Sequence, residues 1–168
     1  MNYSGIIYND IANGNGIRTS LFVSGCRNHC EGCFNKECQD FNYGEPYTEE
    51  VENNIIESIN NDYIKGLTLL GGDPLEPENA RDLISLVTKV KDIYKGSKDI
   101  WLYTGYTKEY LESINNEDIN KILSLIDVLV DGPFILEQRD IRLRFRGSAN
   151  QKIWIKDSSN NFILDPNQ

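Results

Sequence analysis

Short apolar runs alternate along the chain with longer segments whose apolar residues recur every three or four positions. The runs at 18–24, 66–70, 100–103 and 127–131 have the length and composition of buried strands. Helical spacing follows from residue 49, from residue 77, and over 107–114 and 117–125. This alternation predicts right-handed crossovers between parallel strands.

Two of the predicted helices have recognisable first residues. Thr48 precedes Glu49 and Glu50, so its hydroxyl suits an N-cap and the two carboxylates suit the positive end of the helix dipole. Pro77 opens the next helix, where the missing N–H costs nothing.

These elements predict an α/β fold with a mainly parallel, curved sheet. A complete eight-unit barrel needs about 250 residues. The chain has 168 residues, so we expect a partial (β/α) barrel that forms a single domain over 1–168. The ends add a small hairpin near 5–16 and short strands at 152–156 and 162–164.

Polar, glycine-containing motifs follow each of the four buried strands. They are Gly25-Cys26, Gly71-Gly72-Asp73-Pro74, Thr104-Gly105 and Asp131-Gly132. Because the carboxyl ends of parallel strands share one edge of a sheet, we expect these motifs to meet at a single ligand site.

The charge balance limits the partners. Lys and Arg total 17 against 26 Asp and Glu, a net charge of −9, which argues against a nucleic-acid binder. We find neither a long apolar stretch nor a signal peptide, so we expect a cytoplasmic protein without a membrane partner. Four arginines nevertheless cluster between Arg139 and Arg146. They form either a solvated face or a contact for an anionic group on a ligand or partner.

All four cysteines lie between residues 26 and 38. Three of them, Cys26, Cys30 and Cys33, form a CxxxCxxC pattern, which can hold three irons of a cubane cluster and leave the fourth iron open. Structural zinc is the alternative, with Cys38 or His29 as a fourth ligand. Zinc ligands usually come as two separated pairs, so the spacing favours an iron–sulfur cluster.

The CxxxCxxC pattern directly after a strand resembles the radical S-adenosylmethionine superfamily. The resemblance implies a [4Fe-4S] cluster on Cys26, Cys30 and Cys33, with S-adenosylmethionine chelating the open iron. Gly71-Gly72-Asp73-Pro74 is similar to the GGEP motif of that superfamily, with Asp in place of Glu, and implies contacts to the methionyl group. The resemblance further implies that Gly32, Cys33 and Phe34 flank the bound cofactor, although Gly32 stands where many members have an aromatic residue.

Further motifs resemble the glycyl-radical activases of anaerobic ribonucleoside-triphosphate reductase. These motifs are Ser24-Gly25-Cys26, Gly32-Cys33-Phe34-Asn35, Tyr103-Thr104-Gly105-Tyr106, Val130-Asp131-Gly132-Pro133-Phe134 and Arg146-Gly147-Ser148 with Asn150-Gln151. The resemblance implies that a low-potential donor such as flavodoxin reduces the cluster and that S-adenosylmethionine is cleaved. The resulting 5′-deoxyadenosyl radical takes a hydrogen atom from a glycine of the reductase. Another small radical S-adenosylmethionine enzyme and a non-catalytic zinc-binding protein are the alternatives.

Three polar residues near these motifs have open roles. Asp131 can bind the ribose, a counter-cation or the glycine loop of the partner, or it can serve a turn or a helix N-terminus. His29 is expected behind the ligands or facing the partner, because hydrogen-atom abstraction needs no base. Cys38 is expected to be a spare thiol.

Overall fold

The computed structural model describes residues 1–168. The strands are β1 (Asn2–Asp10), β2 (Ile17–Val23), β3 (Glu45–Pro46), β4 (Ile64–Gly71), β5 (Asp99–Tyr103), β6 (Val128–Asp131), β7 (Lys152–Lys156) and β8 (Phe162–Leu164). The helices are α1 (Glu49–Ser58), α2 (Pro77–Tyr94), α3 (Lys108–Ile114) and α4 (Glu117–Leu125), with short 3₁₀ turns η1 (Lys36–Gln39) and η2 (Leu136–Gln138).

All eight strands belong to one mixed sheet in the order β3-β1-β2-β4-β5-β6-β7-β8. The four central strands, β2, β4, β5 and β6, are parallel, as predicted. Both flanks are antiparallel. β1 and β2 form the hairpin predicted near 5–16, and β7 and β8 are the strands predicted at 152–156 and 162–164, although the antiparallel pairing of β7 and β8 was not predicted. Short connections account for two of these pairs, since the links 11–16 and 157–161 permit hairpins but are too short for crossovers. The α/β class is thus confirmed, and the partial barrel stays a prediction.

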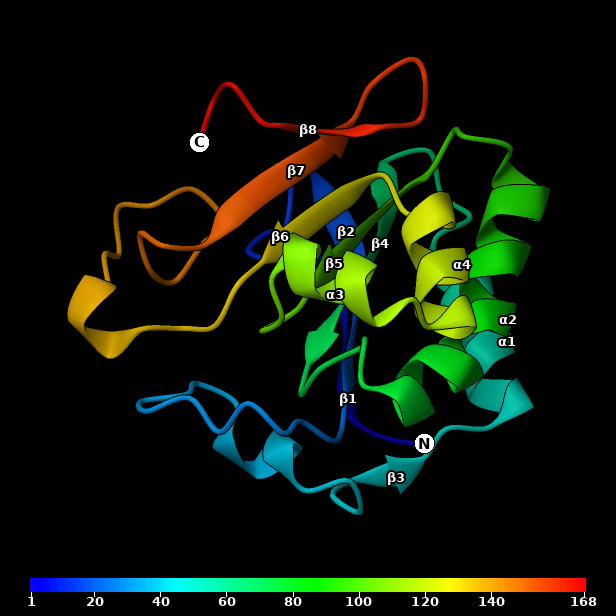
Figure 1. Cartoon of the computed structure of the whole chain (residues 1–168). Helices are drawn as coiled ribbons and strands as arrows, with labels where there is room; N and C mark the ends of the chain where they lie inside the picture. Colours follow the sequence, from blue (N-terminus) through cyan, green and yellow to red (C-terminus); the bar gives the residue numbers. More distant parts are fainter.

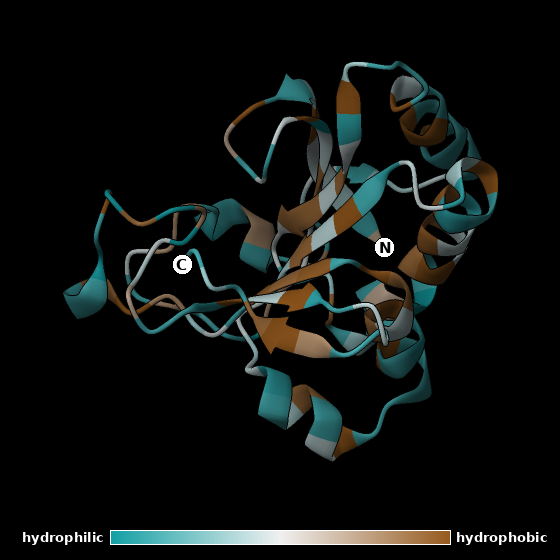
Figure 2. Cartoon of the chain, turned by 90° about the horizontal axis from the view of Figure 1, so that it is seen from above, coloured by the Kyte–Doolittle hydropathy of each residue, from teal (hydrophilic) through white to brown (hydrophobic).

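The helices α1, α2 and α4 pack on one face of the sheet (Figure 1). Alternate strand residues such as Leu21, Leu69 and Leu102 are fully buried in that interface. Because side chains of a strand alternate between its two faces, their neighbours Phe22 and Leu70 point away from the helices. Hydrophobic segments concentrate in the central strands (Figure 2). The second face of the sheet is therefore free to line a cavity.

The predicted helix starts are confirmed. The Thr48 hydroxyl accepts a hydrogen bond from the Val51 amide at 3.3 Å, and Pro77 is the first residue of α2. Thr107 and Asn116 cap α3 and α4 in the same way. No helix combines the length and the apolar composition that a membrane crossing requires.

Candidate functional site

Backbone hydrogen bonds join the ends of β2 and β4 to the cysteine segment. The Gly72 amide donates to the Val23 carbonyl at 2.7 Å, and the Asp73 amide donates to the Gly25 carbonyl at 2.8 Å. The Gly25 amide donates to the Cys38 carbonyl at 2.7 Å. The two strand ends and the far end of the cysteine segment are therefore held as one unit, and the predicted meeting of these motifs is confirmed.

Gly72 lies where no side chain fits. A Cβ atom at this position would come within 2.6 Å of the carbonyl oxygens of both Cys38 and Gly25. These are backbone atoms, which cannot swing aside as the end of a flexible side chain can. Gly71, one residue earlier, has a φ of 108°, a conformation that side chains rarely adopt. The double glycine thus allows the turn after β4 to pass against the cysteine segment.

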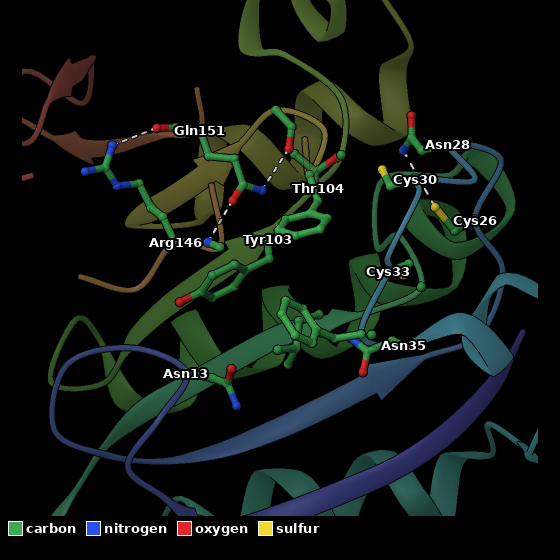
Figure 3. Close-up of a pocket in the computed structure, with 18 of the residues that line it drawn as sticks. Asn13, Cys26, Asn28, Cys30, Cys33, Asn35, Tyr103, Thr104, Arg146 and Gln151 are labelled. Carbon is green, nitrogen blue, oxygen red and sulfur yellow. Dashed lines mark hydrogen bonds between the residues drawn. The ribbon is translucent and has the colours of Figure 1, made fainter. Parts of the chain in front are cut away.

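A cavity of about 520 Å³ opens at this junction. Its wall includes Cys26, Cys30 and Cys33, with Gly71 and Gly72 from the strand end. The three cysteines lie at one end of the cavity, and Arg146, Gln151 and Asn13 lie toward the other (Figure 3). The large aromatic and aliphatic side chains in the wall are Phe22, Phe34, Leu70, Tyr103, Phe134, Leu143 and Phe145. The cavity therefore has thiols at one end and mostly apolar side chains along the rest of its wall.

The three cavity cysteines are unpaired and partly exposed. The Cys26 sulfur accepts a hydrogen bond from the side-chain nitrogen of Asn28 at 3.6 Å. Burial, together with the nearby Asp73 carboxylate, raises the pKa of the Cys26 thiol to about 11. Without a metal this thiol is protonated at neutral pH, so metal loading releases its proton.

This donor set fits an iron–sulfur cluster. No three His, Cys, Asp or Glu side chains gather closely enough to hold one metal ion. A cubane cluster does not require such a gathering, because each thiolate binds its own iron. Three thiols around one cavity of this size are therefore compatible with a cluster.

Cys38 and His29 lie apart from these thiols. Cys38 is buried outside the cavity, and its thiol donates to the Ser4 hydroxyl at 3.1 Å. His29 is exposed, and its Nδ1 pairs with the Gln39 side-chain oxygen at 3.0 Å. Neither residue lines the cavity with the CxxxCxxC thiols.

Asp73 lies behind the cavity wall and is completely buried. Its carboxylate accepts hydrogen bonds from the Thr104 hydroxyl at 2.9 Å, the Gly105 amide at 2.9 Å and the Asn28 side chain at 3.1 Å. The Leu75 amide donates to the same carboxylate at 2.9 Å. Burial outweighs these bonds and raises the pKa of Asp73 to about 7. Asp73 thus ties the end of β4 to the end of β5 and to the cysteine segment.

Two buried polar residues at the start of α2 form hydrogen bonds to the beginning of the cysteine segment. Neither was predicted from the sequence. Glu76 accepts from the Arg27 amide at 2.7 Å, from the Arg27 guanidinium and from the Tyr106 hydroxyl at 2.9 Å. The Asn79 side chain donates to the carbonyls of Ser24 at 3.0 Å and Asp73 at 2.9 Å. The only signal in the sequence is their position in the first turn after the Gly-Gly-Asp-Pro motif.

Two predicted site residues lie at the edge of the cavity. Asp131 is buried, its pKa is raised by that burial, and it accepts from the Lys108 amide at 2.6 Å. It therefore serves the N-terminus of α3, while the next residue, Gly132, lines the cavity. Gly32 is exposed and lies beside Leu136 outside the cavity wall.

Other cavity residues were not predicted as site residues. Asn13, Asn28, Asn35, Leu143 and Phe145 all line it. Asn13 and Leu143 come from loops with no periodic pattern, so only the folded chain brings them to the strand ends.

The chain matches known proteins over nearly its whole length. A family model described as a 4Fe-4S single cluster domain matches residues 12–154. A relative from Escherichia coli (strain K12), "Anaerobic ribonucleoside-triphosphate reductase-activating protein", is 43% identical over 91% of this chain and 97% of its own.

The chain belongs to this activating-protein family. A Vibrio cholerae relative with the same name is 46% identical, over 91% of this chain and 97% of its own. An Enterobacteria phage T4 relative, also so named, is 38% identical over 92% and 94%. Family membership agrees with the resemblance found in the sequence motifs.

Proposed function

We propose that this chain activates an anaerobic ribonucleoside-triphosphate reductase by generating a glycyl radical on it through reductive cleavage of S-adenosylmethionine. The observation that carries the proposal is the cavity, where three free thiols meet the double-glycine end of β4. The names of the relatives supply the target, because each describes an activator of this reductase.

Cys26, Cys30 and Cys33 would each bind one iron of a [4Fe-4S] cluster. When bound and reduced, the cluster would supply the electron for cleavage of the C5′–S bond of S-adenosylmethionine to methionine and a 5′-deoxyadenosyl radical. The chain contributes the positioning. Asn28 contacts the Cys26 sulfur, and the Asp73 and Glu76 networks hold the start of the cysteine segment at Asn28 and Arg27.

The methionyl group would bind at the end of β4. The Gly72 amide is already bonded to Val23, whereas no donor of the chain bonds the Gly72 carbonyl. A free carbonyl oxygen is an acceptor for an ammonium group, so we assign the methionyl amino group to this atom. In this proposal Asp73 acts by holding the turn in place, and Asp131 acts by placing Gly132.

The adenosine would occupy the apolar body of the cavity. A volume of about 520 Å³ lies within the usual range for small-molecule sites. Phe34 would flank the cofactor from within the cavity wall, and Gly32 would do so from the adjoining loop. We place this site on the inner face of a partial (β/α) barrel, in a single domain that works in the cytoplasm with a low-potential donor such as flavodoxin.

The test is activation of the purified reductase under anaerobic conditions. The reconstituted chain, S-adenosylmethionine and dithionite should together produce a glycyl radical on the reductase, detected by electron paramagnetic resonance. Formation of 5′-deoxyadenosine without any glycyl radical would instead favour another small radical S-adenosylmethionine enzyme. A colourless chain that takes up zinc and no iron would contradict the proposal altogether.

A further inference from the structure

Two loops meet at the mouth of the cavity. One is the cysteine loop, and the other follows β6 and includes η2; both extend on the same side of the molecule (Figure 1). The rings of Phe34 and Phe134 lie 5.4 Å apart, and the Arg139 guanidinium lies 5.4 Å from the centre of the Phe34 ring. We use the name mouth surface for Phe34, Phe134, Leu136 and Arg139, together with the exposed Ile141, which follows two residues after Arg139 in the same loop.

The mouth surface exposes large apolar side chains. Phe34 is 67% exposed, and Ile141 is 87% exposed. Phe34 and Phe134 also form part of the cavity wall, so the surface is continuous with the cavity. Apolar side chains that gather around a cavity mouth are typical of an interaction site.

The charge of this surface is opposite to that of the whole chain. The chain carries a net charge of −9, yet arginines cluster in this loop. Arg142 is paired with Asp140, and Arg144 is paired with Asp165. Arg139 has no carboxylate partner in the chain, and its guanidinium lies over the Phe34 ring. A free guanidinium on an aromatic ring can pair with a carboxylate of a partner.

We propose that the mouth surface is where the reductase docks, through a polypeptide segment that presents an apolar side chain next to an Asp or Glu. This inference rests on the proposed function, because activation requires a glycine of the reductase to reach the cavity, and Phe34 and Phe134 belong both to its wall and to this surface. The apolar partner residue would pack against Ile141 and Phe34, and the acidic one would pair with Arg139. Charge complementarity favours an acidic segment over a basic one.

The experiment compares two mouth variants with two matched controls. Arg139→Gln and Ile141→Asp alter the mouth surface without touching the cysteines or the glycine turn. Lys121→Gln on α4 and Ile93→Asp on α2 make the same kinds of change at exposed positions outside the mouth surface. Titration calorimetry with the purified reductase measures the Kd of the anaerobic complex. The amount of 5′-deoxyadenosine formed with dithionite and no reductase measures the chemistry of the chain alone.

We expect each mouth variant to raise the Kd by about tenfold, as loss of a central interface contact does. The controls should bind like wild type, and all four variants should form 5′-deoxyadenosine like wild type. The Arg139→Gln complex should also depend less on salt, because one ion pair is missing.

Unchanged affinity in both mouth variants would overturn the docking proposal while leaving the proposed function intact. Normal reductase binding with slower reduction of the cluster by flavodoxin would assign the surface to the electron donor. This result would also overturn the docking proposal. Loss of 5′-deoxyadenosine formation in the variants would assign the surface to the cofactor. Failure of wild type to bind or activate the reductase would instead contradict the proposed function.

Discussion

At the residue scale, Asp73 is the most constrained polar group of the site. Its carboxylate is fully buried and accepts hydrogen bonds from Leu75, Thr104, Gly105 and Asn28. The motif predicted a carboxylate in contact with the cofactor. Sequence spacing alone could not reveal that the donors come from two other strand ends and enclose the side chain.

Asp73→Asn tests this role through stability. The amide nitrogen of Asn would face an N–H donor on either side, because the Leu75 and Gly105 amides donate to opposite oxygens of the carboxylate. We expect the free energy of unfolding of the metal-free chain at pH 8 to fall by about 1–3 kcal/mol. Urea denaturation measures it, and Asp62→Asn, at an exposed position, is the control. Equal stability of the two variants would contradict the network described for Asp73.

The same residue predicts a pH dependence. Burial raises the pKa of Asp73 from 3.8 to about 7 in the folded chain. Between these values the folded chain holds a proton that the unfolded chain has released. This contribution to stability is therefore greatest below pH 4 and is lost as the pH rises toward 7.

Denaturant titrations of the metal-free chain at several pH values measure this effect. Wild type should lose more stability than Asp73→Asn between pH 4 and pH 7, because the amide does not titrate. Parallel pH profiles for the two chains would show that Asp73 ionises normally in the fold.

At the element scale, the central strands and their helices follow from the apolar pattern. β2, β4, β5 and β6 lie within two residues of the predicted runs, since each run is buried on both faces of the sheet. The antiparallel flanks were less predictable. β1 is half-buried over its first five residues and then exposed, without alternation, and β3 contains only two residues, so neither has a strong periodic signal.

The close approach of β4 to the cysteine segment can be tested at one atom. Gly72→Ala places a Cβ within 2.6 Å of two carbonyl oxygens, so the turn and the cysteine segment must separate. We expect a loss of about 1–3 kcal/mol in stability from overpacking. Iron content after anaerobic reconstitution should fall as well, because the segment that carries Cys26 is displaced.

Gly5→Ala provides the matched control. A Cβ at Gly5 meets nothing within 4 Å, so this variant should keep wild-type stability and iron content. Full iron loading of Gly72→Ala would indicate that the contact between β4 and the cysteine segment does not support the site.

At the scale of the whole molecule, the cavity brings together segments from residue 12 to residue 151. The topological rule for parallel strands predicted that the four motifs would meet, and they do. It could not predict Asn13, Leu143 or Phe145, which reach the cavity from loops. Cys38 is close in sequence to the other thiols, but the CxxxCxxC pattern set it apart, and the structure buries it beside Ser4 outside the cavity.

The central claim is that Cys26, Cys30 and Cys33, without Cys38, hold the cluster that cleaves S-adenosylmethionine. The most direct measurement is the yield of 5′-deoxyadenosine per chain after anaerobic reconstitution and dithionite reduction, compared between Cys33→Ala and Cys38→Ala. We predict that Cys38→Ala binds about four irons and forms the product like wild type, whereas Cys33→Ala forms none. Product formation by Cys33→Ala, or its loss in a folded Cys38→Ala chain, would contradict this account.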